Sequence, residues 1–523
     1  MVAIQLLFHP LVQPFTWATS GRWMQGFSFS KVMHDLLRAI VEAALLPHQT
    51  WLALDAFLRI WYRRFISHRG LLEWTSAQVM HWNAPGKTRA FVISMGLSSI
   101  FSAIAGWAVQ CWAPSNLSVA GPWLVLWFIS PLVGWLLTIR PLERPRQSRL
   151  PEKDLRFLRR VARRTWNYFS EFVGKETSWL PPDNYQVSHT NQLSMRTSPT
   201  NIGFWMLSAL GAHDFGYLTV DQVVEKLTRT AKTIGKLERY EGHLLNWYDI
   251  QTLAPLEPRY VSMVDSGNLL GCLWALEQGL DELIQTPVLD VNAFEGLRDT
   301  GEILKQAVEE EGVSGFDLHG LNELMRMLKS PPERISDSIR LLRQVESSLR
   351  TLADEARESA ESKTGVVYWA KQMQSQASAW LEIADRYLAW IEILDEKTEE
   401  EIARLGQDVL LAYRGILHRA PSVLDLADEN IVCIQLLRSA REEALTDADP
   451  VFEWIDRLMQ AFAKSKWLAS EMLALSRQLI RDGHELSESI NVRFLYDTER
   501  RLFSIGYNVS EGHLDSSYYD LLA

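Results

Sequence analysis

The sequence predicts an all-α protein, in which a transmembrane helical hairpin precedes an incomplete α/α toroid-like domain that carries a long helical insertion. Three observations lead to this fold class. Two stretches before residue 140 are uncharged and apolar, the segments after residue 150 alternate helical periodicity with polar loops, and the region 285–485 is long, charged and helical in pattern. At 523 residues, the chain is long enough for more than one domain.

Composition narrows the classes of partner and compartment. The formal net charge of -11 and the pI of about 5.7 argue against nucleic acid as the main partner. Three widely spaced cysteines, Cys111, Cys272 and Cys433, predict free thiols in a reducing compartment. The first residues lack a basic region and a small-residue cleavage site, so we expect no signal peptide.

The first region, residues 1–85, is rich in tryptophan and predicts contact with a membrane. Eleven of the 21 tryptophans precede residue 140, and Trp favours the bilayer interface. Residues 36–66 have a helical period and a broad apolar face, with charged side chains recurring through them. We therefore predict an interfacial amphipathic helix pair broken near Pro47, with a soluble helical hairpin as the alternative.

The region 86–145 contains the predicted transmembrane hairpin. Residues 91–112 and 119–139 are uncharged, and each stretch has roughly the 20 residues that a helix needs to cross hydrocarbon. Basic residues precede and follow the pair, which places both of its ends and the rest of the chain in the cytoplasm. The basic run after it could also touch anionic headgroups, or form a solvated helix face. That run comprises Arg140, Arg144, Arg146, Arg149, Lys153, Arg156, Arg159, Arg160, Arg163 and Arg164.

The region 146–284 predicts the first helices of the toroid-like domain. We expect helices over 155–174, from Pro199 to Gly211 or Gly216, over 218–239 and over 268–284. Thr197 or Ser198 can cap the second of them, and Pro199 suits its first turn. The segment 239–271 is predicted to be mostly loop, because glycine and proline interrupt it.

The remaining regions are a helical insertion and a return to the first domain. Over 285–485 the charge runs indicate solvated helix faces, and the sequence does not decide between an insertion and a partner-binding arm. Residues 486–523 predict two short strands, 494–496 and 502–505, joined by a turn at 497–500. The run 515–519 is then expected to lead into a helix start. The chain stops at Ala523 within an apolar helical pattern, so we expect an interrupted domain.

Three polar signatures are predicted to lie where a loop leads into a helix: TSPTNIG (197–203), VDSGNL (264–269) and LDSSYY (514–519). Capping explains any one such residue, because helix starts leave backbone N–H groups unpaired. The polar and aromatic residues of the adjoining loops favour sugar binding, since Asp and Asn form hydrogen bonds with hydroxyls and aromatic rings cover a sugar's C–H face. The predicted substrate-binding residues are Asn201, Asn246, Trp247, Tyr248, Asp249, Asp265, Ser266, Asn268, Tyr507, Asn508, Asp515 and Tyr518.

The sequence does not identify catalytic residues. Sugar transfer usually needs two carboxylates, and the candidates Asp265, Glu241 and Glu511 have no spacing that marks them as catalytic. His243 and His513 lack a ligand partner at metal-like spacing, so we predict no metal. There is no P-loop and no dinucleotide-binding glycine signature.

Several long motifs resemble one family. TSPTNIG, RYEGHLLNWYD, PRYVSMVDSGNL and LYDTERRLFSIGYN…LDSSYYDLLA resemble the middle region of cyclic β-1,2-glucan synthases, which are large inner-membrane proteins of bacteria. LLPHQTWLALDAFLRIWYR and RGLLEWT resemble the segment that follows the glycosyltransferase domain of that family. The resemblance runs from about Ala44 to Ala523 and is weakest over 285–480.

This resemblance implies a function. The family polymerises glucose from UDP-glucose, closes the β-1,2-glucan by transglycosylation, and controls its length with phosphorylase-like domains. The region here resembles the first part of the glucoamylase-like (α/α)6 domain that closes the ring, with the catalytic carboxylates expected beyond Ala523. No cofactor is expected in this region, because UDP-glucose, with or without a divalent metal, would bind only in the absent glycosyltransferase domain.

The resemblance also implies partners and a location. The expected partners are β-1,2-glucan, inner-membrane lipids, and the missing glycosyltransferase and phosphorylase-like regions of the same protein. The expected location is the bacterial inner membrane, crossed more than once, with the soluble part cytoplasmic. Two alternatives stay open: a non-catalytic, membrane-tethered glucan-binding scaffold, and an endo-β-1,2-glucanase-like hydrolase.

Overall fold

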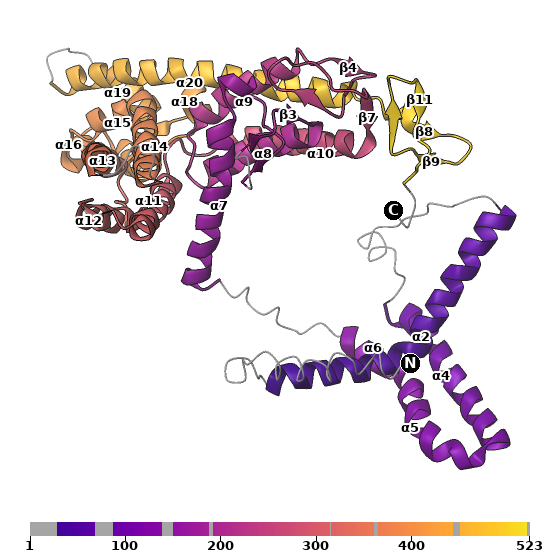
Figure 1. The fold of residues 1–523 in the computed structure, drawn as a ribbon. Coiled ribbons are helices and arrows are strands. Elements are labelled where there is room, and N and C mark those ends of the chain that lie inside the picture. Colours follow the sequence, from indigo (N-terminus) through magenta and orange to yellow (C-terminus); the bar gives the residue numbers. More distant parts are fainter. Residues whose placement is uncertain are drawn as a thin grey trace. The chain divides into compact units, whose positions relative to one another are not determined.

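The computed structural model describes residues 29–67, 87–138, 150–187, 192–313, 315–359, 365–442 and 450–519. The chain divides into two compact units, Met1–Arg149 and Leu150–Ala523 (Figure 1). The described residues are mostly helical, with a few strands of two or three residues, which confirms the prediction of an all-α protein.

The first unit begins with one long helix, α2 (Phe29–Tyr62), which continues into a π-helical turn, η1 (Arg63–Ser67). The predicted break near Pro47 is wrong, because α2 runs through that residue. Proline lacks an N–H, so the carbonyl of Ala43, four residues earlier, loses its intrahelical donor. The indole Nε1 of Trp127 donates to that carbonyl at 3.1 Å, and this contact replaces the missing hydrogen bond.

The two uncharged stretches of the first unit form different structures. The first lies in one helix, α4 (Lys87–Trp112). The second follows a short 3-10 turn, η2 (Pro114–Asn116), and consists of α5 (Leu117–Phe128) and α6 (Ser130–Thr138).

The prediction of a single helix over 119–139 is wrong, because the helix is interrupted at Ile129. Pro131 explains the interruption, since its ring clashes with the carbonyl four residues earlier and it supplies no N–H. At the break, the Phe128 carbonyl accepts a hydrogen bond from Ser99 Oγ of α4 at 2.7 Å. One turn earlier, the Leu124 carbonyl accepts a hydrogen bond from Ser102 Oγ at 2.5 Å.

Within the described ranges, no single helix has both the length and the apolar character that crossing a bilayer requires. Pro114–Phe128 and Ser130–Leu137 satisfy both criteria only when taken together, as a pair bent by 42°.

The second unit begins with four helices, α7 (Glu152–Phe172), α8 (Pro199–Asp214), α9 (Val220–Ile234) and α10 (Met263–Leu283). These confirm the four helices predicted in the region 146–284. Helix α8 packs against both α9 and α10, and fully buried Trp205 of α8 stacks on Trp166 of α7 with ring centroids 5.8 Å apart. Ser198 caps α8, accepting a hydrogen bond from the Asn201 N–H at 3.2 Å, with Pro199 in the first turn as predicted.

Helix α10 begins five residues before the predicted start. Ser262 is its N-cap and accepts from the Asp265 N–H at 3.2 Å. The sequence VDSGNL therefore lies inside the first turns of α10 rather than in a loop, and Gly267 does not interrupt the helix.

The loops before and after these helices carry short antiparallel strands. Most of the segment 239–271 is non-helical, as predicted, although 263–271 belongs to α10. The hairpin near the C-terminus is also confirmed. The pairs are β1 (Tyr185–Gln186) with β2 (Gln192–Leu193), β3 (Arg196–Thr197) with β6 (Tyr248–Asp249), β4 (Arg239–Tyr240) with β5 (His243–Leu244), and β8 (Tyr496–Asp497) with β9 (Leu502–Phe503). A three-stranded sheet has the order β11 (His513–Leu514), β10 (Gly506–Asn508), β7 (Tyr260–Ser262).

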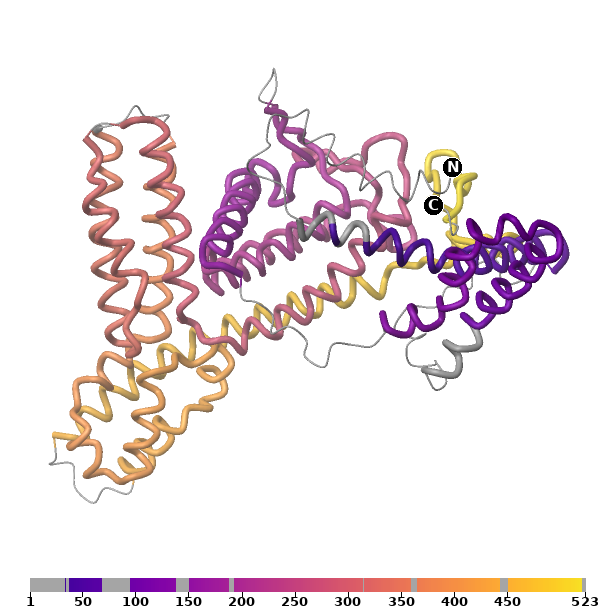
Figure 2. Tube along the Cα trace, turned by 90° about the horizontal axis from the view of Figure 1, so that it is seen from below, coloured from indigo at the N-terminus to yellow at the C-terminus, as the bar shows by residue number. Residues whose placement is uncertain are grey.

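The region 285–485 is helical, as predicted, and its long helices lie side by side as an elongated arm (Figure 2). The last of its helices, α20, packs against α15, α18 and α19 of the arm and also against α9 and α10 (Figure 1). The helices are α11 (Val291–Glu311), α12 (Leu318–Lys329), α13 (Ile335–Ser359), α14 (Gly365–Tyr387), α15 (Ala389–Leu394), α16 (Glu399–Ala403), α17 (Gln407–His418), α18 (Val423–Ala427), α19 (Val432–Glu442) and α20 (Pro450–Ser489). The closed α/α ring stays a prediction.

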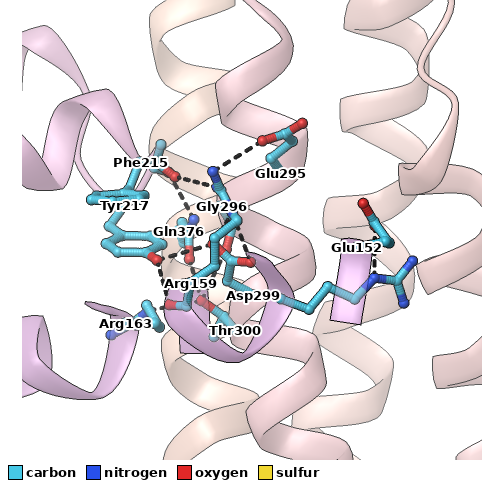
Figure 3. A network of polar contacts seen from close by, with 12 residues as sticks. Glu152, Arg159, Arg163, Phe215, Tyr217, Glu295, Gly296, Asp299, Thr300 and Gln376 are labelled. Atoms are coloured by element: carbon cyan, nitrogen blue, oxygen red, sulfur yellow. Dashed lines mark hydrogen bonds and ion pairs between the residues drawn. The ribbon is translucent and has the colours of Figure 1, made fainter. Parts of the chain in front are cut away.

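A buried polar network fastens α7 to the arm (Figure 3). Arg159 Nε donates to both carboxylate oxygens of Asp299 at 2.9 and 3.1 Å, and the Tyr217 hydroxyl donates to the same carboxylate at 2.9 Å. One turn along, Arg163 Nε donates to Thr300 Oγ1 at 2.8 Å, and burial lowers the pKa of Arg163 to about 10. Arg159 and Arg163 therefore face the protein interior, so these two members of the basic run do not form a lipid-facing or solvated surface.

Candidate functional site

The candidate site is a group of polar side chains around Asp265, at the start of α10. Thr200 Oγ1, in the first turn of α8, donates to Asp265 Oδ1 at 2.6 Å. With its amide oriented to satisfy both neighbours, Asn246 donates to Asp265 Oδ2 at 2.8 Å and accepts from Trp247 Nε1 at 3.1 Å. The packing of α8 against α10 thus brings two of the polar signatures together with the loop at 246–247.

Asn268 extends this group toward solvent. Its side chain is exposed, and its Nδ2 donates to Thr200 Oγ1 at 3.1 Å. A continuous chain of hydrogen bonds therefore runs from Asn268 through Thr200 and Asp265 to Asn246 and Trp247. We call these five residues the Asp265 cluster.

A second group adjoins the Asp265 cluster through Trp247. The Arg196 guanidinium lies 4.3 Å from the centroid of the Trp247 ring, and Arg196 Nη2 lies 3.1 Å from Asp183 Oδ2. Asn201 Nδ2 donates to the other oxygen of Asp183 at 3.2 Å. Pairing of β3 with β6 puts Arg196 opposite Asp249, beside Trp247.

The sequence reasoning missed Asp183, Arg196 and Thr200 as members of the site. Arg196 contacts Trp247, and Asp183 contacts Arg196, through tertiary interactions for which the local pattern has no signal. Thr200 was within reach, because it lies inside the TSPTNIG signature from which Asn201 was chosen.

Two predicted sugar-binding residues lie in the protein interior. Tyr248 is 0% exposed, and its hydroxyl donates to the Glu238 carbonyl and accepts from the Leu245 N–H, both at 2.6 Å. Ser266 is buried beside His243. We assign structural roles to Tyr248 and Ser266 in place of the predicted contact with sugar, because neither side chain reaches the surface.

The protonation of His243 follows from its two partners. Its Nε2 lies 2.9 Å from the Asn491 carbonyl, which can only accept, so this nitrogen carries the proton. Burial lowers the pKa of His243, which favours the neutral ring, and Ser266 Oγ then donates to Nδ1 across 2.7 Å. The contact fixes the first turn of α10 against the strand β5 and the residues after α20.

Two further predicted residues stabilise turns. Asp249 Oδ1 accepts from the N–H groups of Gln251 and Thr252 at 2.9 and 2.8 Å, and these bonds, that of Thr252 first, lower the pKa of Asp249. Asn508 Oδ1 accepts from the Glu511 N–H at 3.0 Å. Such bonds within a turn are typical of Asp and Asn, so both residues shape the loops that border the site.

The C-terminal signature lies beside the start of α10, through the pairing of β10 with β7. The Tyr260 hydroxyl donates to Asp515 Oδ2 at 3.2 Å, and the Tyr518 hydroxyl donates to Asp497 Oδ2 at 2.9 Å. Partial burial and the nearby Asp265 carboxylate both raise the pKa of Tyr519. The three polar signatures therefore meet around one helix start.

Residues 515–519 are not helical, because the Asp515 side chain closes a turn by accepting from the Ser517 N–H at 3.0 Å. The helix start that this run was predicted to lead into lies outside the described residues. Tyr507 stacks on Tyr240 with centroids 5.3 Å apart and 15° between the rings, so one of its faces is covered by protein.

The three candidate catalytic carboxylates have different surroundings. Asp265 is bonded within the cluster described above. Glu241 is exposed in the β4–β5 turn, where Asn491 Nδ2 donates to its Oε2 at 3.0 Å. Glu511 is exposed beside His513, with 2.7 Å between Oε2 and Nε2, and the pKa of His513 is raised, first by its bond to the Leu514 carbonyl and then by Glu511.

The comparisons with known proteins agree with the motif resemblance. No protein-family model matches the chain. The chain is 30% identical over 498 residues to the cyclic beta-(1,2)-glucan synthase NdvB of Rhizobium meliloti (strain 1021). The matched region covers 94% of this chain and 15% of that relative, so the chain spans a small part of the relative's length. The chain therefore belongs to the cyclic β-1,2-glucan synthase family, as its motifs predict.

Proposed function

We propose that this chain is the part of a membrane-bound cyclic β-1,2-glucan synthase that binds linear β-1,2-glucan for cyclisation by transglycosylation. The Asp265 cluster is the observation that carries this proposal. It gathers one carboxylate, two amides, one hydroxyl and one indole from the starts of two packed helices and from the loop at 246–247.

The chemistry of the cluster suits a neutral, hydroxyl-rich ligand. Asp and Asn side chains can each bond two neighbouring hydroxyls, and a tryptophan ring packs on the C–H face of a sugar. In this proposal, Asn246, Trp247, Asp265 and Asn268 position glucosyl units, while Asp183, Arg196 and Asn201 hold the indole in place. The residues that cut and rejoin the glycosidic bond belong to another part of the intact enzyme.

The proposal includes attachment to the bacterial inner membrane, with Leu150–Ala523 in the cytoplasm. Its support is the uncharged stretch 91–112 of α4, the bent pair α5–α6, and the basic residues that flank these apolar stretches in the sequence. The glycosyltransferase and phosphorylase-like regions of the same protein would be the partners.

The test uses the longer protein that contains this segment, in membranes supplied with labelled UDP-glucose. Trp247→Ala and Asp265→Asn are expected to reduce cyclic product while linear polymer is retained. Trp274→Ala is the matched control, because Trp274 is an exposed tryptophan (56%) on the same helix as Asp265. An unchanged ratio of cyclic to linear product in both variants would contradict the proposal.

The same assay separates the two alternatives. A non-catalytic scaffold predicts that both variants lose retention of glucan on the membrane without a change in the product ratio. An endo-β-1,2-glucanase-like hydrolase predicts new reducing ends in proportion to the linear polymer consumed. Ring closure by transglycosylation creates no reducing end.

A further inference from the structure

The N-terminal half of α7 carries an exposed apolar stripe. Phe157 is 57% exposed and Val161 is 45% exposed, and these residues lie one turn apart on the same side of the helix. Leu158 beside them and Leu150 just before the helix are also exposed. The stripe lies opposite Arg159 and Arg163, which face the buried network with the arm (Figure 3).

Basic side chains border this stripe. Lys153 and Arg160 lie seven residues apart, and therefore on one edge of the helix. Neither forms an ion pair with an acidic side chain in the part of the chain that the structure describes. Asp154 lies on the apolar side, but it belongs to the first turn, where the helix dipole favours a negative charge.

We propose that this face of α7, formed by Leu150, Phe157, Leu158 and Val161 with Lys153 and Arg160, docks on an anionic lipid surface. A helix with an apolar stripe and basic edges lies in the interface of a bilayer, with its apolar side chains between the headgroups. The basic edge complements anionic headgroups, which attract Lys and Arg near the membrane surface.

The position of α7 in the sequence supports a lipid occupant. Residues 138–151 separate it from the bent apolar pair, which ends at Leu137. A fully extended chain of that length reaches roughly 50 Å. If the pair enters a bilayer, α7 therefore begins within reach of the same surface.

The network in Figure 3 gives this contact a consequence for the arm. Arg159 and Arg163 hold the opposite face of α7 against α11 through Asp299 and Thr300. Docking of the exposed face would therefore hold α11, the first helix of the arm, near the bilayer. This inference does not depend on which sugar the Asp265 cluster binds.

A depth measurement tests the proposal with the full chain in nanodiscs. In a Cys111→Ser background, Phe157→Cys or Val161→Cys is labelled with an environment-sensitive fluorophore, since Cys272 and Cys433 are buried. Headgroup nitroxide lipids are then added to bilayers that contain phosphatidylglycerol. We expect quenching at both positions and none at Glu400→Cys, which is exposed on α16 of the arm.

Three results would overturn the proposal. An unquenched, water-exposed label at both positions means that the face stays in solvent. A shielded but unquenched label means that protein covers it. Failure of the full chain to associate with the bilayers removes the surface on which the proposal depends.

Charge reversal gives a second, independent reading. Lys153→Glu with Arg160→Glu is expected to weaken the association of this face with anionic bilayers about fivefold per residue, which is measured as reduced quenching at position 161. Lys232→Glu with Lys236→Glu makes the same charge change at exposed positions in and just after α9 and is the matched control. An equal loss of quenching in both double variants would show that only the net charge of the protein matters, and would overturn the proposal. Glucan binding should be unchanged in both.

Discussion

Trp127 completes the helix α2 at the point where Pro47 leaves it incomplete. The Ala43 carbonyl has no donor at position 47, and the indole N–H of Trp127 donates to it across 3.1 Å. A proline inside a helix is costly because it removes one hydrogen bond and crowds the preceding turn. In this unit, the α5 side chain offsets part of that cost.

This relationship predicts a specific coupling between Trp127 and Pro47. Trp127→Phe should destabilise the first unit by about 1–3 kcal/mol, because it leaves a carbonyl without a partner. In a Pro47→Ala background the same substitution should cost less, because the backbone N–H that this change introduces would restore the intrahelical donor. Amide hydrogen exchange of residues 44–52 measures both effects, and equal increases in exchange in the two backgrounds would refute the coupling.

Thr200 is predicted to position the Asp265 carboxylate. Thr200→Val keeps the shape of the side chain but removes the donor to Asp265 and the acceptor for Asn268. We expect linear β-1,2-glucan to bind about tenfold more weakly, a change of about 1.4 kcal/mol.

Titration calorimetry with the full chain measures this change. Thr228→Val is the control, because the Thr228 hydroxyl is buried without a hydrogen-bond partner and should lose nothing. Equal affinities for the Thr200 and Thr228 variants would remove Thr200 from the site.

Substitutions of Tyr248 and Asn268 are predicted to have opposite effects: the first should lower stability alone, and the second should lower glucan affinity alone. Tyr248→Phe leaves the Glu238 carbonyl and the Leu245 N–H unpaired, and should destabilise the second unit by about 1–3 kcal/mol. Its glucan affinity, measured on the folded fraction, should be unchanged. Asn268→Ala should show the reverse pattern, so a loss of affinity in Tyr248→Phe at full folding would restore the original prediction for Tyr248.

Glu429 predicts an acid sensitivity of the arm. Its carboxylate bonds to Arg438 and lies 2.8 Å from Lys466 of α20, and these cations hold the pKa of Glu429 at about 2, below the ordinary value of 4.5. Because the pKa of the folded state is depressed, the contribution to stability is present above pH 4.5 and is lost as the pH falls toward 2.

Glu429→Gln should therefore cost roughly 1–3 kcal/mol at neutral pH, after allowance for solvent screening, and almost nothing at pH 2. Urea unfolding followed from pH 7 to pH 2 measures this difference. Glu400→Gln, at an exposed position of α16, should show no such dependence. A Glu429→Gln curve parallel to that of the unsubstituted protein would exclude the ion pairs as its source.

Local chemistry predicted most helices, and tertiary context explains the errors. The Ser198 cap and Pro199 were sufficient to place the start of α8. Ser262 is the same kind of cap, but Gly267 pointed to a break although it lies within α10. The second apolar stretch was predicted as one helix from its length and absence of charge, without regard to Pro131, whose missing N–H interrupts the helix.

The residue types of the candidate site were predictable from the sequence, but whether each side chain points toward solvent or into the core was not. Asp265, Asn246 and Trp247 form the predicted polar group, and the same reasoning chose Tyr248 and Ser266, which point into the core. A polar residue in a loop or a first helical turn can face either way, and the buried partners that decide it are distant in sequence. The bond from His243 to the Asn491 carbonyl, across 248 positions, is one such case.

The double packing of α20 restricts how this protein could have acquired or could lose its arm. Trp454, Ile455, Leu458 and Phe462 in its first half are buried among the arm helices, while Leu479 and Leu486 in its second half are buried near α9 and α10. Excision of 285–449 would leave the first half of a 40-residue helix as an apolar projection. Homologues without an arm should therefore have a shorter α20 with polar residues at the positions that correspond to Trp454 and Phe462.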